Sequence, residues 1–129
     1  MAPFSQLLTL ALMPLIALAA PPNAAVEKRD TPGNVQVCTA PSWGGDCDVV
    51  SIGITGACQP IPSPWQYNIG SMGPDRGAIC RLYDSAHPTC TGSGLAILSY
   101  PGSTNLITPR DFPGYNAAYW NCQPCSSCQ

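Results

Sequence analysis

Eight cysteines are the feature that most constrains this chain, and all of them lie between Cys38 and Cys128. The segment from residue 30 to residue 129 is long enough for one domain with a modest core. Disulfides staple small secreted domains of this kind, whereas in a reducing compartment the same residues bind zinc or carry out redox chemistry. The C-terminal sequence NCQPCSSCQ, with two Cys-x-x-Cys spacings, fits either interpretation, so the compartment decides between them.

The N-terminus predicts secretion. Residues 7–20 are almost wholly apolar and contain Ala17-Leu18-Ala19, a small-x-small triplet typical of a signal-peptidase site. The run is short for a membrane span, which needs about 20 apolar residues, and no second run follows it. We therefore expect a signal peptide over residues 1–19, no transmembrane segment, and a secreted, extracellular protein.

A dibasic pair, Lys28-Arg29, lies in a Pro- and Ala-rich segment that shows no folding pattern. Such a segment is accessible to proteases. The pair resembles the processing sites of fungal propeptides, which implies a propeptide over residues 20–29 and a mature domain over residues 30–129. Lys28 is the only lysine of the chain, which favours processing over a chance pair. We expect residues 123–129 to form a cysteine-rich tail.

In an oxidising compartment we expect every cysteine to form a disulfide. Zinc would need a second ligand pair, and the chain has one histidine, His87, in a loop-like sequence. Spacing does not determine the connectivity, since eight cysteines allow on the order of 100 pairings. We favour Cys47–Cys58 and Cys80–Cys122. The expected disulfide cysteines are Cys38, Cys47, Cys58, Cys80, Cys90, Cys122, Cys125 and Cys128.

Charge excludes some classes of partner. The segment 30–129 has six aspartates, three arginines and no lysine, which gives a net charge of −3. So few basic residues cannot neutralise many phosphates, so we expect no nucleic-acid binding. No polybasic patch is present that would attract the protein to an anionic membrane.

Short strands separated by turns predict an all-β fold. Apolar residues alternate in NVQVCTA, DCDVVSIGIT, AICRLYD and GLAILSY, and no ten-residue window has helical periodicity. A weak internal repeat divides the chain into residues 34–76 and 77–122, each closing on an aromatic stretch that contains Asn, WQYNIGSMG or GYNAAYWNC. Two four-stranded units of this kind describe two Greek keys that pack as one sandwich.

This two-unit pattern resembles a βγ-crystallin domain. It is most similar to small secreted βγ-crystallin-like proteins of fungi and actinomycetes, which include killer-toxin-like proteins. The resemblance covers residues 34–122 and rests on VCTAPSWGGDCDVVSI, SPWQYNIGSMGPDRGAICRLYD and CTGSGLAILSYPGSTNL. It implies that Trp43 and Tyr83 occupy the aromatic corner positions and that Ser71 tethers a folded hairpin. The expected fold is therefore one disulfide-stapled sandwich of two Greek keys.

Many domains of this family bind Ca²⁺ through the motif Asn/Asp-Asn/Asp-x-x-Ser/Thr-Ser, because this cation takes about six to eight oxygen ligands. Both copies are degenerate here, QYNIGS at 66–71 and GYNAAY at 114–119. We therefore expect no specific metal site and no cofactor. The degenerate ligand positions are Gln66, Tyr67, Gly70 and Ser71 in the first copy and Gly114, Tyr115, Ala118 and Tyr119 in the second.

The sequence contains no catalytic pattern. His87 is the one candidate for a general base near neutral pH, and its Pro-flanked loop is typical of a solvated histidine. No serine lies in a Gly-x-Ser-x-Gly elbow, and the spacing of the aspartates does not pair two carboxylates. We expect a non-enzymatic protein without catalytic residues.

Recognition of a target is the function that remains. Aromatic residues in loops are typical binding anchors, although a small sandwich also buries them. We expect a monomeric protein that binds an extracellular protein or a cell-surface target of another organism, as an effector, killer toxin or antimicrobial protein. The candidate binding aromatics are Trp43, Trp65, Tyr67, Tyr115 and Trp120.

Three alternatives stay open. A protease inhibitor needs a rigid exposed loop, which residues 61–64 or 99–102 offer, and the fold type resembles a known metalloproteinase-inhibitor family. A structural protein of the fungal surface would also be rich in cysteine, but hydrophobins carry adjacent Cys-Cys pairs and this chain has none. A degenerate calcium-binding stress protein is the third alternative.

Overall fold

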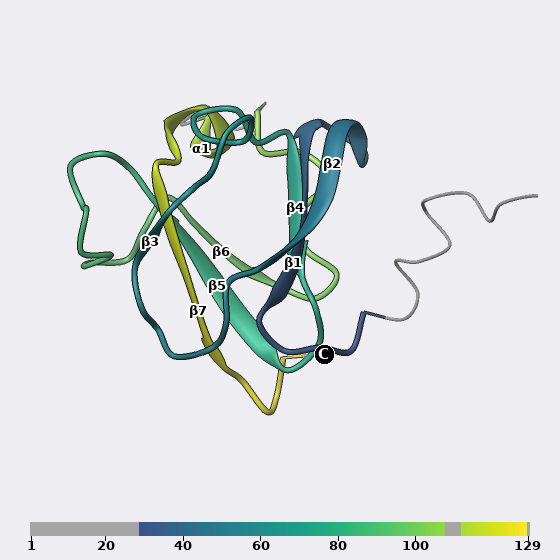
Figure 1. Cartoon of the computed structure of the whole chain (residues 1–129), viewed down its shortest axis with the longest axis vertical. Coiled ribbons are helices and arrows are strands. Elements are labelled where there is room, and N and C mark those ends of the chain that lie inside the picture. The colour runs from purple at the N-terminus through teal and green to yellow at the C-terminus, as the bar shows by residue number, and fades with distance from the viewer. Residues whose placement is uncertain (1–28, 108–111, 129) are drawn as a thin grey trace, which may run out of the picture.

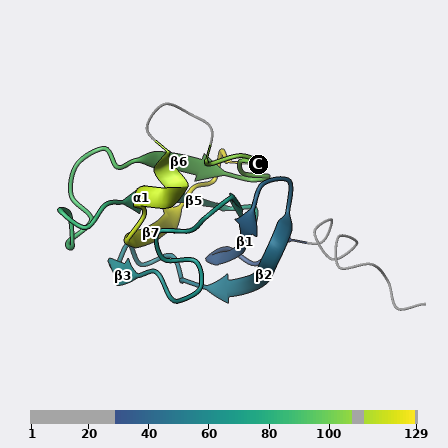
Figure 2. The same ribbon diagram turned by 90° about the horizontal axis from the view of Figure 1, so that it is seen from above.

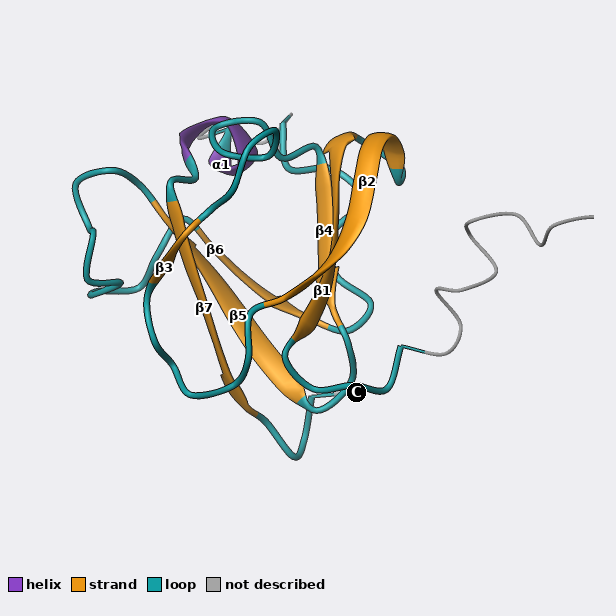
Figure 3. Ribbon diagram, in the orientation of Figure 1, coloured by secondary structure: helices purple, strands orange, loops and turns teal. Residues whose placement is uncertain are grey.

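Two antiparallel β-sheets form the framework of the fold (Figures 1 and 3). The computed structural model describes residues 29–107 and 112–128. The expected signal peptide over 1–19 and the expected propeptide up to Lys28 lie outside the described residues. Within the described part of the chain, no helix has the length and apolar character needed to cross a membrane.

The first sheet has the strand order β2-β1-β4. Its strands are β1 (Asn34–Ala40), β2 (Gly44–Ser51) and β4 (Ser71–Pro74). β1 lies in the centre and is antiparallel to both neighbours. The alternation predicted for this strand directs Val35 and Val37 into the core, where both are fully buried.

The second sheet has the strand order β3-β7-β5-β6. Its strands are β3 (Gln59–Pro60), β5 (Ala78–Tyr83), β6 (Ala96–Ser99) and β7 (Tyr119–Pro124). The core face of β5 carries Leu82, on the face opposite to that of Ile79, as the alternation predicts. The one helix of the described residues, α1 (Pro113–Asn116), is a single turn just before β7 (Figure 2).

The two sheets have matching strand orders, which confirms the two-unit prediction. β2-β1-β4 of the first unit corresponds to β6-β5-β7 of the second. Each unit also gives one segment to the opposite sheet: β3 pairs with β7, and Ser103 forms a bridge with Met72 of β4. This exchange joins the two Greek keys into one sandwich whose core includes Trp120, Ile69 and Leu82.

All eight cysteines are paired. The expected Cys80–Cys122 bridge is confirmed, and it joins directly opposite residues of β5 and β7 inside the core. The expected Cys47–Cys58 bridge is wrong. Cys47 instead pairs with Cys38, because register places these two residues opposite each other on β1 and β2, with a Cα–Cα distance of 4.1 Å. The remaining bridges are Cys58–Cys90 and Cys125–Cys128.

Candidate functional site

Ser71 is a structural residue at the end of the first degenerate calcium motif. Its side chain is fully buried, and its hydroxyl donates to the carbonyl oxygen of Ala40 at 2.8 Å. The same hydroxyl accepts a hydrogen bond from the backbone N–H of Trp43 at 3.1 Å. These two bonds tie β4 to the β1–β2 hairpin, which confirms the tether that the family resemblance implies.

The two glycines of the calcium motifs leave no room for ligand side chains. A Cβ at Gly70 would collide with the backbone of Ala40, and a Cβ at Gly114 would collide with the carbonyl oxygen of Ile69. In family members these positions carry oxygen-bearing side chains, whereas here neighbouring backbone fills that space. Calcium binding needs several convergent oxygens. The residues present at the two motifs therefore do not fit this cation.

In the part of the chain that the structure describes, no acidic cluster takes the place of the degenerate motifs. Within residues 29–107 and 112–128, no group of three or more His, Cys, Asp or Glu side chains converges at a geometry that would hold a metal ion. The predicted lack of a specific metal site stays a prediction, now supported by the packing around both glycines.

The predicted binding aromatics separate into core and surface residues. The prediction of an accessible anchor is wrong for Trp65 and Trp120, which are 8% and 1% exposed. Trp120 lies on β7 and faces the core between the sheets, where a large apolar ring gains most from burial. Trp65 is buried too, and its indole N–H donates to the carbonyl oxygen of Asp46 at 2.9 Å. Trp43 is half-buried.

Three exposed aromatic side chains lie near α1, and we call Tyr67, Phe112 and Tyr115 the aromatic edge. Each is 46–47% exposed. The rings of Phe112 and Tyr115 stack with their centroids 6.3 Å apart. The backbone N–H of Tyr67 donates to the carbonyl oxygen of Ala117 at 2.8 Å, which brings its loop beside α1 (Figure 1). Two of the predicted aromatics, Tyr67 and Tyr115, are thus exposed on neighbouring segments.

The backbone of the aromatic edge is strained. Tyr67 has a φ of 57° and Phe112 has a φ of 40°, and both values fall in the left-handed region that bulky residues rarely adopt. Such conformations cost on the order of 1–3 kcal/mol and cluster at binding sites. Hydrogen bonds from Tyr67 to Ala117 and from Ile69 to Gly114 hold the two segments together despite this cost.

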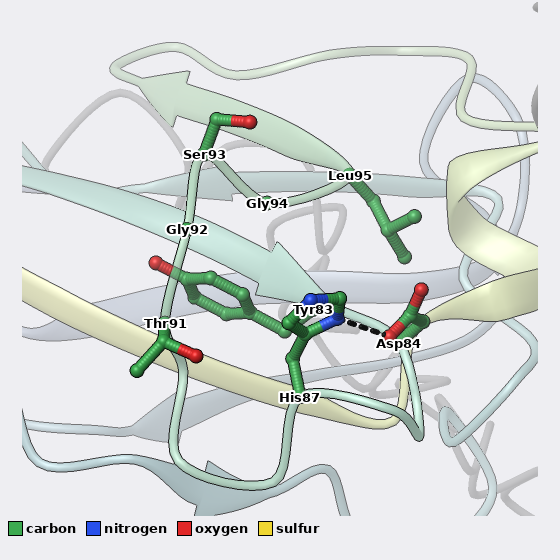
Figure 4. A pocket seen from close by; sticks show the side chains of 8 residues that line it. All are labelled: Tyr83, Asp84, His87, Thr91, Gly92, Ser93, Gly94 and Leu95. Carbon is green, nitrogen blue, oxygen red and sulfur yellow. Dashed lines mark hydrogen bonds and ion pairs between the residues drawn. The ribbon is translucent and has the colours of Figure 1, made fainter.

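A small pocket of about 260 Å³ lies beneath the loop that joins β5 to β6. Figure 4 shows the imidazole of His87 directed at the carboxylate of Asp84, and its Nδ1 lies 2.6 Å from Oδ1. This hydrogen bond, with help from the backbone N–H of Ala86, lowers the pKa of Asp84. The Cys58–Cys90 disulfide anchors the same loop. The lining residues are Tyr83, Asp84, His87, Thr91, Gly92, Ser93, Gly94 and Leu95.

The hydrogen bond of the His87 ring in this pocket is to a carboxylate and not to one of the hydroxyls that line it. Figure 4 shows the hydroxyl of Ser93 on the side of the pocket away from His87. A nucleophile has to lie within hydrogen-bond reach of its base, at roughly 2.6–3.2 Å. The one partner that the imidazole contacts through Nδ1 is the carboxylate of Asp84. The Asp84–His87 pair therefore acts as a link within an exposed turn.

Arg29 is buried in the structure, although the sequence predicts an accessible residue at a processing site. The expectation of a residue that no part of the fold holds is wrong for Arg29 itself, because its side chain is 4% exposed and forms an ion pair of 3.0 Å with Asp75. Its backbone carbonyl also accepts a hydrogen bond from the N–H of Arg76. Processing after Arg29 stays a prediction, and Lys28 lies outside the described residues.

Sequence reasoning missed three features of these surfaces. Phe112 was overlooked, although the Pro113-Gly114 pair directly after it signals a turn. The pairing of Asp84 with His87 has a weak signal in their spacing of three residues. No local sequence signal indicates the ion pair of Arg29 with Asp75, since 46 residues separate them.

Comparison with known proteins supports the fold. No family model matches the chain, and no curated protein matches its sequence. Among solved structures, the chain is similar to a βγ-crystallin domain of Abundant Perithecial Protein from Neurospora crassa, solved in its Ca²⁺-bound form. The TM-score is 0.53 at 11% sequence identity, and the match covers 74% of this chain and 93% of that one. The protein therefore has a βγ-crystallin-like fold.

Proposed function

We propose that this protein is a secreted, non-enzymatic binding module that acts on another organism by engaging an extracellular target through its aromatic edge. The observation that carries the proposal is the exposure of three large aromatic side chains, Tyr67, Phe112 and Tyr115, on segments that lie beside one another. Exposed tyrosines and other large aromatics supply binding area at a low cost in conformational entropy. The two strained residues at this surface, Tyr67 and Phe112, support a binding role.

The scaffold suits a protein released into a hostile medium. Four disulfides cross-link a chain that carries a predicted signal peptide and has a modest core. A bridge that closes a long loop stabilises such a domain by roughly 2–4 kcal/mol, and one that closes a short loop contributes less. These features favour an effector, killer toxin or antimicrobial protein over an intracellular calcium buffer.

The test is growth and membrane permeability of a panel of yeasts and bacteria exposed to the purified secreted protein. A reduced and alkylated sample of the same protein serves as the control for the folded state. We expect inhibition that disappears on reduction. No effect on any microbe in the panel would overturn the toxin and antimicrobial reading.

The contribution of the aromatic edge is tested with Tyr67→Ala and Tyr115→Ala. Ile97→Ala is the matched control, because Ile97 is an apolar side chain with 53% exposure on β6. A binding anchor loses about 2 kcal/mol or more on truncation, which is about thirtyfold in affinity. We therefore expect the effective concentration to rise about thirtyfold for the tyrosine variants and to stay unchanged for Ile97→Ala. Equal effects of all three variants would remove the aromatic edge from the mechanism.

A further inference from the structure

The side chain of Arg29 fills a site that is complementary to a guanidinium group. Nε donates to Oδ1 of Asp75 at 3.0 Å, and one terminal nitrogen donates to Oε1 of Gln36 at 3.4 Å. The other terminal nitrogen donates to the carbonyl oxygen of Gly73. Each nitrogen of the planar fork therefore has its own acceptor. Asp75 and Gln36 are only 4% and 8% exposed, so the site lies inside the protein.

Two aromatic rings form the walls of this site. The central carbon of the Arg29 guanidinium lies 5.8 Å from the ring centroid of Trp43 and 5.6 Å from that of Tyr100. The guanidinium of Arg76 lies 4.5 Å from the same Tyr100 ring. A cation within about 6 Å of an aromatic face is attracted to it, and arginine is the preferred partner. The site thus combines a carboxylate, two neutral oxygens and two rings.

Processing after Arg29 would remove the occupant of this site. Oδ1 of Asp75, Oε1 of Gln36 and the carbonyl oxygen of Gly73 would then each lose the hydrogen bond that Arg29 donates. Asp75 would keep the backbone N–H of Thr31, which donates to its Oδ2 at 3.1 Å. Buried acceptors without donors are unfavourable, and a buried carboxylate without a cation is more so. Removal of Arg29 would therefore leave the Asp75 carboxylate open to a new cationic donor at this position.

We propose that this is a guanidinium-binding site, which Arg29 fills before processing and which afterwards takes an arginine side chain of the target. The inference rests on the proposed function, because it supposes an external target, and on processing after Arg29. The net charge of −3 of residues 30–129 also favours a basic partner. Arg29 in the unprocessed chain then acts as an internal inhibitor of this contact.

Arginine fits the site better than a compact cation does. An ammonium is a point charge with no planar fork, so it does not present a separate nitrogen to each of the three acceptors as the Arg29 guanidinium does. This holds for a lysine side chain and for the α-ammonium group of Asp30 that cleavage creates. Arginine over lysine is therefore the selectivity that identifies the site.

The experiment compares the processed protein with a form that keeps Arg29. The full chain is secreted from a yeast host, and mass spectrometry determines its N-terminus. The matched variant Lys28→Ala removes half of the dibasic signal and leaves Arg29 in its site. N-acetylarginine methylamide is titrated into each ¹⁵N-labelled protein, with N-acetyllysine methylamide as the control probe. Amide signals of Gln36, Gly73 and Asp75 report binding, and the whole spectrum reports folding.

We expect the secreted wild-type protein to begin at Asp30 and to bind the arginine probe saturably, in the millimolar range. The lysine probe is expected to bind about tenfold more weakly. The Lys28→Ala protein is expected to show no shift at the three reporter positions. The proposal is overturned if the wild-type protein keeps Arg29, if it shows no saturable shift, or if both forms or both probes behave alike.

The titration uses no cells, so its result is separate from the growth assay. A protein that inhibits microbes without binding the arginine probe loses the guanidinium site and keeps the proposed function. A protein that binds the probe but harms no microbe keeps the site and loses the proposed toxin function.

Discussion

The substitution Ser71→Ala tests whether the first calcium motif has become a structural tether. The hydroxyl of this fully buried residue donates to Ala40 and accepts from Trp43, and alanine removes both hydrogen bonds without a large change in volume. Each lost bond costs about 1 kcal/mol on average. We therefore expect the free energy of unfolding to fall by about 2 kcal/mol. For a domain of this size that lowers Tm by about 10 °C.

The assay is thermal unfolding followed by circular dichroism, with Ser99→Ala as the control. Ser99 lies on β6 and is exposed, so its substitution should change stability by less than about 0.5 kcal/mol. The difference between Ser71→Ala and wild type should be the same with and without millimolar Ca²⁺. A Ser71→Ala protein as stable as the Ser99→Ala control would refute the tether. Calcium stabilisation that only the wild-type protein shows would instead make Ser71 a ligand.

Three further outcomes are expected. Gly70→Ser should lower Tm without creating calcium binding, because its Cβ collides with the β1 backbone, and a calcium-dependent rise in Tm would contradict this. In an NMR pH series, the pKa of the Asp84 carboxyl should lie below its ordinary value of 3.8, because His87 hydrogen-bonds to it. The stability that this hydrogen bond contributes is present above pH 3.8 and is lost as the pH falls through the lowered pKa. Replacing Cys80 and Cys122 together by alanine should cost about 4 kcal/mol in chemical denaturation, because the bridge closes a loop of 42 residues. Removal of the Cys125–Cys128 bridge should lower the free energy of unfolding by clearly less, because its cysteines are three residues apart. Equal losses of stability for the two bridges would contradict the loop-entropy argument.

Most of the fold followed from patterns that are local in sequence. Alternating apolar residues predicted the strand faces, and burial of Val35, Val37 and Leu82 agrees with them. The repeat of strand and turn predicted two matching units, which the two strand orders confirm. Strand alternation has a period of two, so a short run of residues is enough to reveal which side chains share a face.

Pairings across the molecule were much harder to predict. Cys38–Cys47 depends on the register of β1 against β2, and Cys58–Cys90 depends on two loops that approach each other only in the folded protein. Spacing carries neither kind of information. Cys80–Cys122 was anticipated because these residues lie near the two ends of the second unit, and the register of β5 with β7 confirms it.

Candidate site residues were predicted by type more reliably than by location. Aromatic residues near turns were the right class, yet Trp120 belongs to the core while Tyr67 and Tyr115 lie at the surface. The local sequences WQYN and YWNC do not distinguish these outcomes, since each places aromatics beside polar residues at a strand end or turn. The difference arises from which side of the segment faces the opposite sheet.

The sequence by itself determined the all-β class, the two-unit organisation and the loss of both calcium motifs, because each depends on residue types at short spacing. Tertiary structure alone decided the disulfide partners, the aromatic edge and the burial of Arg29 against Asp75. These features depend on contacts between residues far apart in the chain, and 46 residues separate that last pair. Arg29 is part of a dibasic pair in the sequence, but in the fold a carboxylate, two oxygens and two rings surround its guanidinium.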